Sequence, residues 1–451
     1  MKRVYFSVLI CIFAVSLSAQ PLPRKGSLNA RTSPLNDSLK SVTKAESGLY
    51  VLSVGEGGTA AALKMRAGDV ISRFNGVPVT GNTQLAEAVS QLREGDPVAI
   101  QVIRKKKSVV LSGSIVGKPA EKSDEYEVMY DRVFFAGGFL SMIITKPFGE
   151  GPFPVIYFLP GYMCYSLDNI GDHPYGKLVS GLTKKGYAVV RVEKLGQGAS
   201  MNTPDCRSSG FSDEVEGFRA GLKKIYTIPF IDKKSVFVFG HSLGAMQAPL
   251  VAKDFEVKGI MIEGTSGDTW FEYILAMFRF QNPIMGKDPA ENEAMIQSAI
   301  PLLYTYLVEK EDPALLARIP AFDTILREMM QYDGNGYIWD RHYTYWQELQ
   351  DVNQAAAWRD CDAMVLVMRG SGDLEAFSTE QHEGIVRIIN HYHPGKGSFV
   401  LLRNTDHAFC KSDTPEESYK NSQVKGYHYR EFNEEVINVI HDWMQMVIYP
   451  K

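Results

Sequence analysis

The sequence predicts an α/β protein: a large domain with a doubly wound, mostly parallel sheet, preceded by a small α+β domain. Apolar strand-like runs alternate with helical segments through the second part of the chain. This alternation is typical of a parallel sheet with helices on both faces. The 451 residues, of which 45% are hydrophobic and 22% charged, also exceed one ordinary domain. We therefore expect two folded domains.

The first residues have the order of an export signal. Met-Lys-Arg is followed by an apolar run at 4–17 and by Ser18-Ala19-Gln20, which is the charge, apolar core and small-residue order of a secretory signal. We expect a signal peptide at residues 1–19, export to the periplasm or beyond the cell, and no transmembrane segment in the mature chain. Residues 20–46, rich in Ser, Asn, Lys and Pro, are expected to form a tether.

Residues 47–117 are expected to form the small domain. Gly-Leu-Tyr-Val-Leu-Ser-Val starts at Gly48, Ala-Gly-Asp-Val-Ile at Ala67, and Asn-Gly-Val-Pro-Val at Asn75. A helical segment at 82–92 and strand-like runs at 98–104 and 108–116 follow. This order resembles a bacterial-type PDZ domain.

The resemblance implies capture of a peptide or protein C-terminus, added as a strand beside residues 49–54. The implied contacts are backbone N–H groups near the terminal carboxylate, at Ser47, Gly48 and Leu49, and a side-chain pocket at Leu85, Ala88 and Val89. The alternative is a groove that is empty or filled by a neighbouring loop.

A charged, proline-containing stretch at 118–125 is expected to be a linker. The large domain, 126–451, opens with strands at 126–134 and 139–145. Alternating elements follow, with strands at 154–159, 187–193, 235–239, 257–262, 363–369 and 398–402, and helices at 174–185, 212–224, 378–390 and 431–447. A segment at 265–357 interrupts the alternation and is rich in aromatic residues.

Gly240-His241-Ser242-Leu243-Gly244 stands between the apolar run 236–239 and a helix-compatible segment. The two glycines permit a sharp strand-to-helix turn that lifts the serine clear of the sheet. A serine hydroxyl needs such exposure, together with a histidine base, to act as a nucleophile. The pattern predicts that Ser242 is a nucleophile.

An acid and a base follow two later strands. The strand 364–368 leads to Gly370-Ser371-Gly372-Asp373, and the strand 400–402 leads to Asp406-His407. The order Ser, Asp, His and its placement at strand ends resemble the alpha/beta-hydrolase family. The resemblance implies that Ser242 is the nucleophile, His407 the base and then acid, and Asp373 the carboxylate that stabilises the imidazolium. Glu375 is a rival for the acid, and Asp406 is expected to cap a local turn.

The same resemblance implies an oxyanion hole and a cap. The hole would use the backbone N–H of Leu243 and one from the loop after strand 154–159, at Tyr162 or, as the runner-up, Met163. Pro160 stands where family members commonly have histidine, so the second donor stays open. The insertion 265–357 would be a helical cap whose aromatic rings either wall a pocket for an apolar acyl or aryl group or only attach the cap.

Export makes four cysteines candidates for disulfides. Cys164 and Cys206 each follow a strand expected to end on the same side of the sheet, so they are the candidate pair. Cys361 and Cys410 are expected at opposite ends of the sheet, free and buried. The sequence has no phosphate-binding loop, paired-histidine metal motif or CxxC pair, so we expect no metal or cofactor. A net charge of −4 gives no argument for a nucleic-acid partner.

These patterns favour a secreted serine hydrolase that cleaves a carboxylic ester, on a small-molecule or peptidyl acyl substrate, through an acyl-enzyme. Two alternatives stay open. One is a serine peptidase that acts on peptides, which the peptide-binding module suggests. The other is a scaffold that recruits partners through the PDZ-like domain while the hydrolase domain is inert.

Overall fold

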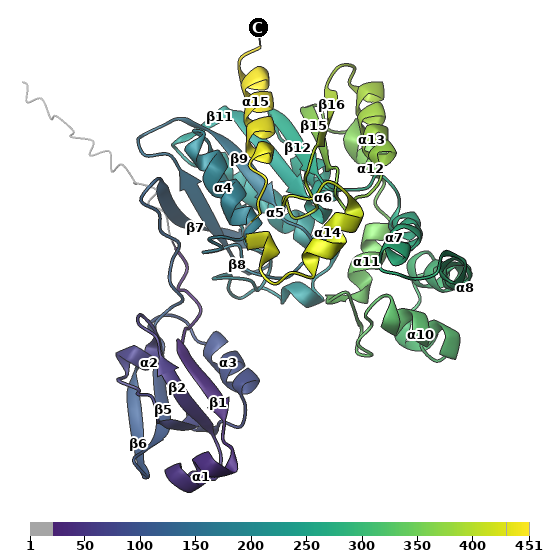
Figure 1. Cartoon of the computed structure of the whole chain (residues 1–451). Coiled ribbons are helices and arrows are strands. Elements are labelled where there is room, and N and C mark those ends of the chain that lie inside the picture. Colours follow the sequence, from purple (N-terminus) through teal and green to yellow (C-terminus); the bar gives the residue numbers. More distant parts are fainter. Residues whose placement is uncertain (1–20, 430, 451) are drawn as a thin grey trace, which may run out of the picture.

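A computed structural model describes residues 21–429 and 431–450. The predicted signal peptide, 1–19, lies outside these residues. Figure 1 shows a small N-terminal body (purple to blue) joined to a larger one through a narrow connection. Across the described ranges, no helix is both long and apolar enough to cross a membrane.

The small domain is built on an antiparallel sheet. Its strand order is β1-β2-β3-β5-β6, with β4 paired to β3. The strands are β1 (Ala30–Pro34), β2 (Leu49–Val54), β3 (Val70–Phe74), β4 (Val77–Pro78), β5 (Pro97–Arg104) and β6 (Lys107–Ser114). The helices are α1 (Asp37–Thr43), α2 (Thr59–Ala62) and α3 (Asn82–Ser90). Leu85 and Val89 of α3 pack into the core of this domain.

The structure corrects two expectations for this domain. Part of the expected tether forms β1 and α1, and β1 pairs with β2 along its length. Because β3 pairs with the other edge of β2, β2 is an inner strand, and the prediction that a peptide adds beside residues 49–54 is wrong. Leu49 is fully buried, and a Cβ on Gly48 would lie 2.4 Å from the carbonyl oxygen of Ile71.

The large domain has an eight-stranded sheet in the order β16-β15-β12-β11-β9-β10-β8-β7. The hairpin β7–β8 and the β8–β10 pair are antiparallel, and the other pairs are parallel. The strands are β7 (Glu127–Phe135), β8 (Gly138–Lys146), β9 (Phe153–Leu159), β10 (Ala188–Val192), β11 (Ile231–His241), β12 (Gly259–Glu263), β15 (Met364–Gly370) and β16 (Gly397–Leu402).

Helices cover both faces of this sheet, as predicted. One core joins the sheet to α4 (Pro174–Lys184) and α15 (Glu435–Ile448). The other joins it to α5 (Phe211–Ile225), α6 (Leu243–Ala252) and α13 (Thr379–Tyr392). Alternate residues of β9 enter opposite cores: Val155 and Tyr157 enter one, and Ile156 and Phe158 enter the other. The remaining elements are η1 (Cys206–Ser208), α14 (Pro415–Ser422) and η2 (Tyr427–Tyr429).

The insertion between β12 and β15 is mainly helical. It contains α7 (Trp270–Ile284), α8 (Pro289–Leu307), α9 (Pro313–Leu316), α10 (Pro320–Glu328), β13 (Tyr337–Ile338), β14 (Arg341–His342), α11 (Tyr343–Gln350) and α12 (Gln354–Arg359). In Figure 1, α7, α8, α10 and α11 form a group beside the sheet (green). Most of its large apolar side chains are buried in, or packed against, the core that includes α5 and α6, so the insertion packs onto the body of the domain.

The loop after β10 belongs to the large domain and forms hydrogen bonds with the small domain. Arg93 of the small domain donates hydrogen bonds to the carbonyl oxygens of Ala199 and Ser200, at 3.1 and 2.7 Å, and Lys25 donates to Gly196 at 2.7 Å. Further along this loop, Cys206 forms a disulfide with Cys164. Cys361 and Cys410 are free and buried.

Glu193 is the first residue of the same loop, and its buried carboxyl should make the free energy of unfolding depend on pH. Its fully buried carboxyl accepts hydrogen bonds from the Ser166 hydroxyl, at 2.5 Å, and the Leu167 N–H, at 3.0 Å. Burial raises the pKa of Glu193 to about 7. Because the folded pKa lies above the unfolded value near 4.3, its contribution is complete below about pH 4 and is lost as pH rises through about 7.

The free energy of unfolding of the wild type is expected to fall by up to about 3 kcal/mol between about pH 4.5 and 7.5 because of Glu193. Glu193→Gln, which does not ionise, should lack this fall. The measurement is the free energy of urea unfolding of both proteins across this range. Parallel pH dependences of wild type and variant would contradict the expectation.

Candidate active site

Ser242 occupies a strained turn between β11 and α6. Its backbone has φ 55° and ψ −124°, a left-handed conformation that is costly for a residue other than glycine. A Cβ on Gly240 would lie 2.4 Å from the Gly244 carbonyl oxygen, and one on Gly244 would lie 2.3 Å from that of Leu159. The flanking glycines are therefore needed for strand, turn and helix to pack this closely.

His407 and Asp373 meet at the carboxyl edge of the sheet. The His407 Nδ1 lies 3.0 Å from Asp373 Oδ2. The fully buried Asp373 also accepts the N–H groups of Glu375 and Ala376 through Oδ1, at 2.8 and 2.7 Å. These bonds hold the carboxylate in one orientation, from which it fixes the imidazole ring.

Asp373 and His407 shift each other's pKa. Burial disfavours the charged imidazole of His407, but the carboxylates of Asp373 and Glu375 outweigh it and raise its pKa well above the usual value. Burial likewise opposes ionisation of Asp373, but His407 outweighs it and lowers the pKa of that carboxyl to about 2. Asp373 is therefore ionised at neutral pH, as an acid that stabilises an imidazolium must be.

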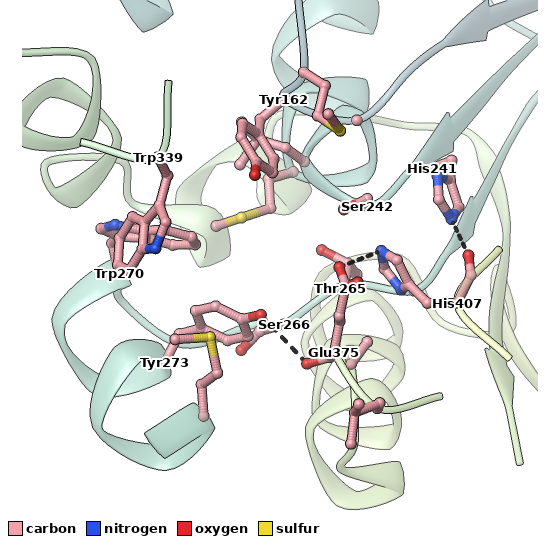
Figure 2. A pocket seen from close by; sticks show the side chains of 18 of the residues that line it. Tyr162, His241, Ser242, Thr265, Ser266, Trp270, Tyr273, Trp339, Glu375 and His407 are labelled. Atoms are coloured by element: carbon pink, nitrogen blue, oxygen red, sulfur yellow. Dashed lines mark hydrogen bonds and ion pairs between the residues drawn. The ribbon is translucent and has the colours of Figure 1, made fainter. Parts of the chain in front are cut away.

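Glu375 contacts the other ring nitrogen. Its Oε2 lies 3.1 Å from His407 Nε2, with the side chain 53% exposed. Among the described residues, Ser242 Oγ has no hydrogen-bond partner, so the expected bond to His407 is not formed. Figure 2 shows Ser242, His407 and Glu375 at the same side of one pocket. Glu375 thus contacts Nε2, the nitrogen that would receive the serine proton. Asp373 contacts Nδ1, the nitrogen to which the orienting acid of a triad binds.

Substitutions of Asp373 and Glu375 would show which of the two carboxylates is the triad acid. Asp373→Asn should lower ester turnover by about 10⁴-fold, because the imidazole loses its tautomer and its counter-charge. Glu375→Gln should keep turnover within about tenfold of wild type. Since the Glu375 charge raises the pKa of His407, its removal should move the acid limb of kcat/KM to lower pH. A larger loss in Glu375→Gln than in Asp373→Asn would make Glu375 the triad acid.

The loop after β9 lies against Ser242. A Cβ on Gly161 would lie 3.4 Å from Ser242 Cβ, and the Gly161 N–H is directed to the Tyr175 hydroxyl at 3.3 Å. Within the described chain, the N–H groups of Tyr162 and Met163 have no acceptor. Leu243 supplies the first N–H of α6. The N–H of Leu243 and that of Tyr162 or Met163 therefore remain as donors for an oxyanion beside Ser242.

His241 and Asp406 support the site without contact to Ser242 Oγ. The His241 ring lies 2.5 Å from the Tyr175 hydroxyl through Nδ1 and 2.8 Å from the His407 carbonyl oxygen through Nε2. Burial and the nearby His407 lower the pKa of His241 to about 3, so it is neutral. Asp406 accepts the N–H groups of Ala408 and Cys410, which makes it the cap of a local turn.

A cavity of about 450 Å³ opens over Ser242 between the sheet and the insertion. Aromatic rings on the side opposite Ser242 and His407 include Trp270 and Trp339 (Figure 2). Trp270 stacks on Trp346 with ring centroids 4.9 Å apart, and Tyr162 meets Trp346 edge-on at 5.5 Å. Some of the predicted aromatic residues thus line the cavity, whereas others, such as Tyr306, are fully buried in the packing of the cap.

Sequence reasoning missed a group of buried charges behind the oxyanion loop. Lys194 follows β10, Glu214 belongs to α5 and Arg341 to β14 of the insertion. Their side chains are at most 2% exposed. No local sequence pattern marks Lys194 or Arg341 as part of a site. The signal lies in the tertiary arrangement alone.

Comparison with known proteins agrees with this architecture. A PDZ-domain family model matches residues 39–112, and the model of the alpha/beta hydrolase family matches residues 156–418. The chain matches none of the curated proteins with which it was compared.

Three of the solved structures to which the chain is similar are the following. Est1E from Butyrivibrio proteoclasticus is 15% identical, with 71% of this chain and 98% of that chain covered and a TM-score of 0.43. The Pyrococcus furiosus esterase Pf2001 is 13% identical, with 73% and 95% covered and a TM-score of 0.42. The Pyrococcus horikoshii acylaminoacyl peptidase is 12% identical, with 78% and 46% covered and a TM-score of 0.42.

Proposed function

The chain belongs to the alpha/beta hydrolase family, and from this premise we propose that it is a serine hydrolase that cleaves carboxylic esters through an acyl-enzyme. One observation carries the proposal: His407, bonded to a buried carboxylate at 3.0 Å, lines the same cavity as a serine on a strained strand-to-helix turn. A base with a fixed tautomer beside an exposed hydroxyl is the requirement for acyl transfer.

In the proposed reaction, His407 Nε2 takes the Ser242 proton as Oγ attacks the ester carbonyl carbon. Glu375 must first give up its contact with Nε2. The N–H groups of Leu243 and Tyr162 stabilise the oxyanion, and Asp373 stabilises the imidazolium. The imidazolium then protonates the departing alcohol, and the acyl group stays on Ser242. A water molecule, deprotonated by His407, releases the acid and restores the serine.

The cavity supports a small ester as substrate. Its volume of about 450 Å³ is in the range of small-molecule sites, and its aromatic wall suits an apolar acyl or aryl group. A peptidase is the second candidate, because the chain carries a PDZ domain. In that domain, the edge strand beside α3 is β1, where Thr32 Oγ1 donates to Asn82 Oδ1 at 2.7 Å. This is the edge at which we propose that a peptide is captured.

We further propose that the protein works in the periplasm or outside the cell. Two observations support this location: the signal-like order of the first residues and the disulfide between Cys164 and Cys206. Disulfides persist in oxidising compartments and are rare in the cytosol.

The proposal is tested by labelling the full-length protein with a fluorophosphonate and mapping the adduct by mass spectrometry. The adduct is expected on Ser242, and turnover of short acyl esters should exceed that of matched peptidyl amides. The reverse ranking would favour the peptidase. An unlabelled protein without hydrolytic activity would leave the scaffold hypothesis.

A further inference from the structure

Three buried charges from separate parts of the chain meet behind the oxyanion loop. Lys194 Nζ lies 3.0 Å from Glu214 Oε1, and Arg341 Nη1 lies 2.9 Å from Glu214 Oε2. Glu214 also accepts hydrogen bonds from Gln247, at 2.9 Å, and Tyr345, at 3.2 Å. The carboxylate is thus fully partnered. We call Lys194, Glu214 and Arg341 the charge cluster.

Both cations of the charge cluster also bind the loop that lies against Ser242. Lys194 Nζ donates to the carbonyl oxygen of Gly161 at 2.6 Å, and Arg341 Nη1 donates to that of Tyr162 at 2.8 Å. The Gly161 carbonyl and the Tyr162 N–H belong to one peptide group, and the Tyr162 carbonyl and the Met163 N–H belong to the next. Each candidate oxyanion donor of this loop is therefore the opposite end of a peptide whose oxygen a cation holds.

The charge cluster carries a surplus positive charge. Two cations share one carboxylate, and the side chains of all three are at most 2% exposed. Burial lowers the pKa of Lys194 to about 8, although Glu214 acts in the opposite direction. An incompletely neutralised buried cation is costly for stability, and such groups gather at functional sites. Here the surplus charge faces the peptides that would bind a developing negative charge.

We propose that Lys194 and Arg341 are positioning residues of the oxyanion hole, which hold the two peptides after Gly161 with their N–H groups toward Ser242. The inference rests on the proposed function and deepens it. A cation on the carbonyl oxygen fixes the peptide plane and polarises its N–H, so the donor needs no reorientation when the oxyanion forms. Because Arg341 belongs to the insertion, the cap completes the site as well as covering it.

The test compares Lys194→Met, in which Glu214 keeps its pair with Arg341, with Lys194→Met/Glu214→Gln, in which the net positive charge of the wild-type cluster is kept but the lysine is absent. Both are expected to lose about 10- to 100-fold in kcat on a p-nitrophenyl ester with KM within about threefold, since the interaction acts on the transition state. Affinity for a trifluoromethyl ketone, whose adduct with serine carries the oxyanion, should fall in parallel.

Lys146→Met is the matched control. Lys146 is also a buried lysine, 6% exposed, that donates to a backbone carbonyl, Gly149 at 2.8 Å, and pairs with Glu127 at 2.7 Å. It lies on β8, outside the catalytic loop. This variant should lower the melting temperature and leave kcat unchanged, which separates positioning from stability alone.

A pH profile gives a readout that a purely structural lysine would not move. Wild-type kcat should fall above about pH 8 as Lys194 loses its proton, and Lys194→Arg, which stays charged, should extend activity to higher pH. Wild-type kcat and ketone affinity in a folded Lys194→Met/Glu214→Gln variant would overturn the inference. Absence of labelling at Ser242 in the wild type would instead overturn the proposed function, so the two failures are distinguishable.

Discussion

Ser242→Ala is expected to reduce ester turnover by about 10⁶-fold, since removal of the nucleophile in a triad costs about as much as removal of the whole triad. Alanine has no Oγ to form the acyl-enzyme, but it leaves the proposed oxyanion donors, the N–H groups of Leu243 and Tyr162, in place. A residual rate above that of water is therefore expected. Fluorophosphonate labelling should disappear completely. Steady-state rates and intact-protein mass spectrometry measure the two effects.

The variant should fold as the wild type does, because the Ser242 hydroxyl has no partner among the described residues whose loss would destabilise them. Ser235→Ala is the matched control: Ser235 is a buried serine within β11, the strand that leads to Ser242. Its turnover should match that of the wild type. If Ser242→Ala kept a tenth of wild-type turnover or more, another residue would have to be the nucleophile.

The elements around the Ser242 turn could be predicted because short sequence patterns mark them. Gly240 and Gly244 are required by contacts within the turn and with the adjoining loop, and the apolar runs mark the strands wherever helices cover both faces. The prediction of the disulfide partners followed from the same reasoning about strand ends, and Cys164 and Cys206 are bonded in the structure.

Other features depend on contacts that a sequence pattern does not contain. Ala30–Pro34 is a short edge strand in a polar segment, and its pairing with β2 removed the edge expected to bind a peptide. Lys194, Glu214 and Arg341 are separated in the chain, and Arg341 joins the other two only because the insertion packs against α5. The position of Glu375 on Nε2 depends on a loop conformation, so the sequence identified a rival acid without showing which nitrogen it contacts.

His407→Gln is expected to lower turnover nearly as far as Ser242→Ala, by about 10⁵- to 10⁶-fold, because no other group takes the serine proton. Glutamine retains a donor for Asp373, so the buried carboxylate is not left unpartnered. The residual rate should also lose the acid limb that titration of His407 gives the wild type. Rates across pH, measured with a p-nitrophenyl ester, would show both effects.

His441→Gln is the matched control, since His441 contacts the Tyr187 hydroxyl through Nδ1 at 2.8 Å and lies on α15, which packs with the core that excludes the cap. It should retain wild-type turnover and pH dependence. If His407→Gln remained active, the assignment would pass to another base. His241 could not serve, because its pKa is lowered to about 3 and both its ring nitrogens are already engaged. The buried bond between His407 and Asp373 would then need a purely structural explanation.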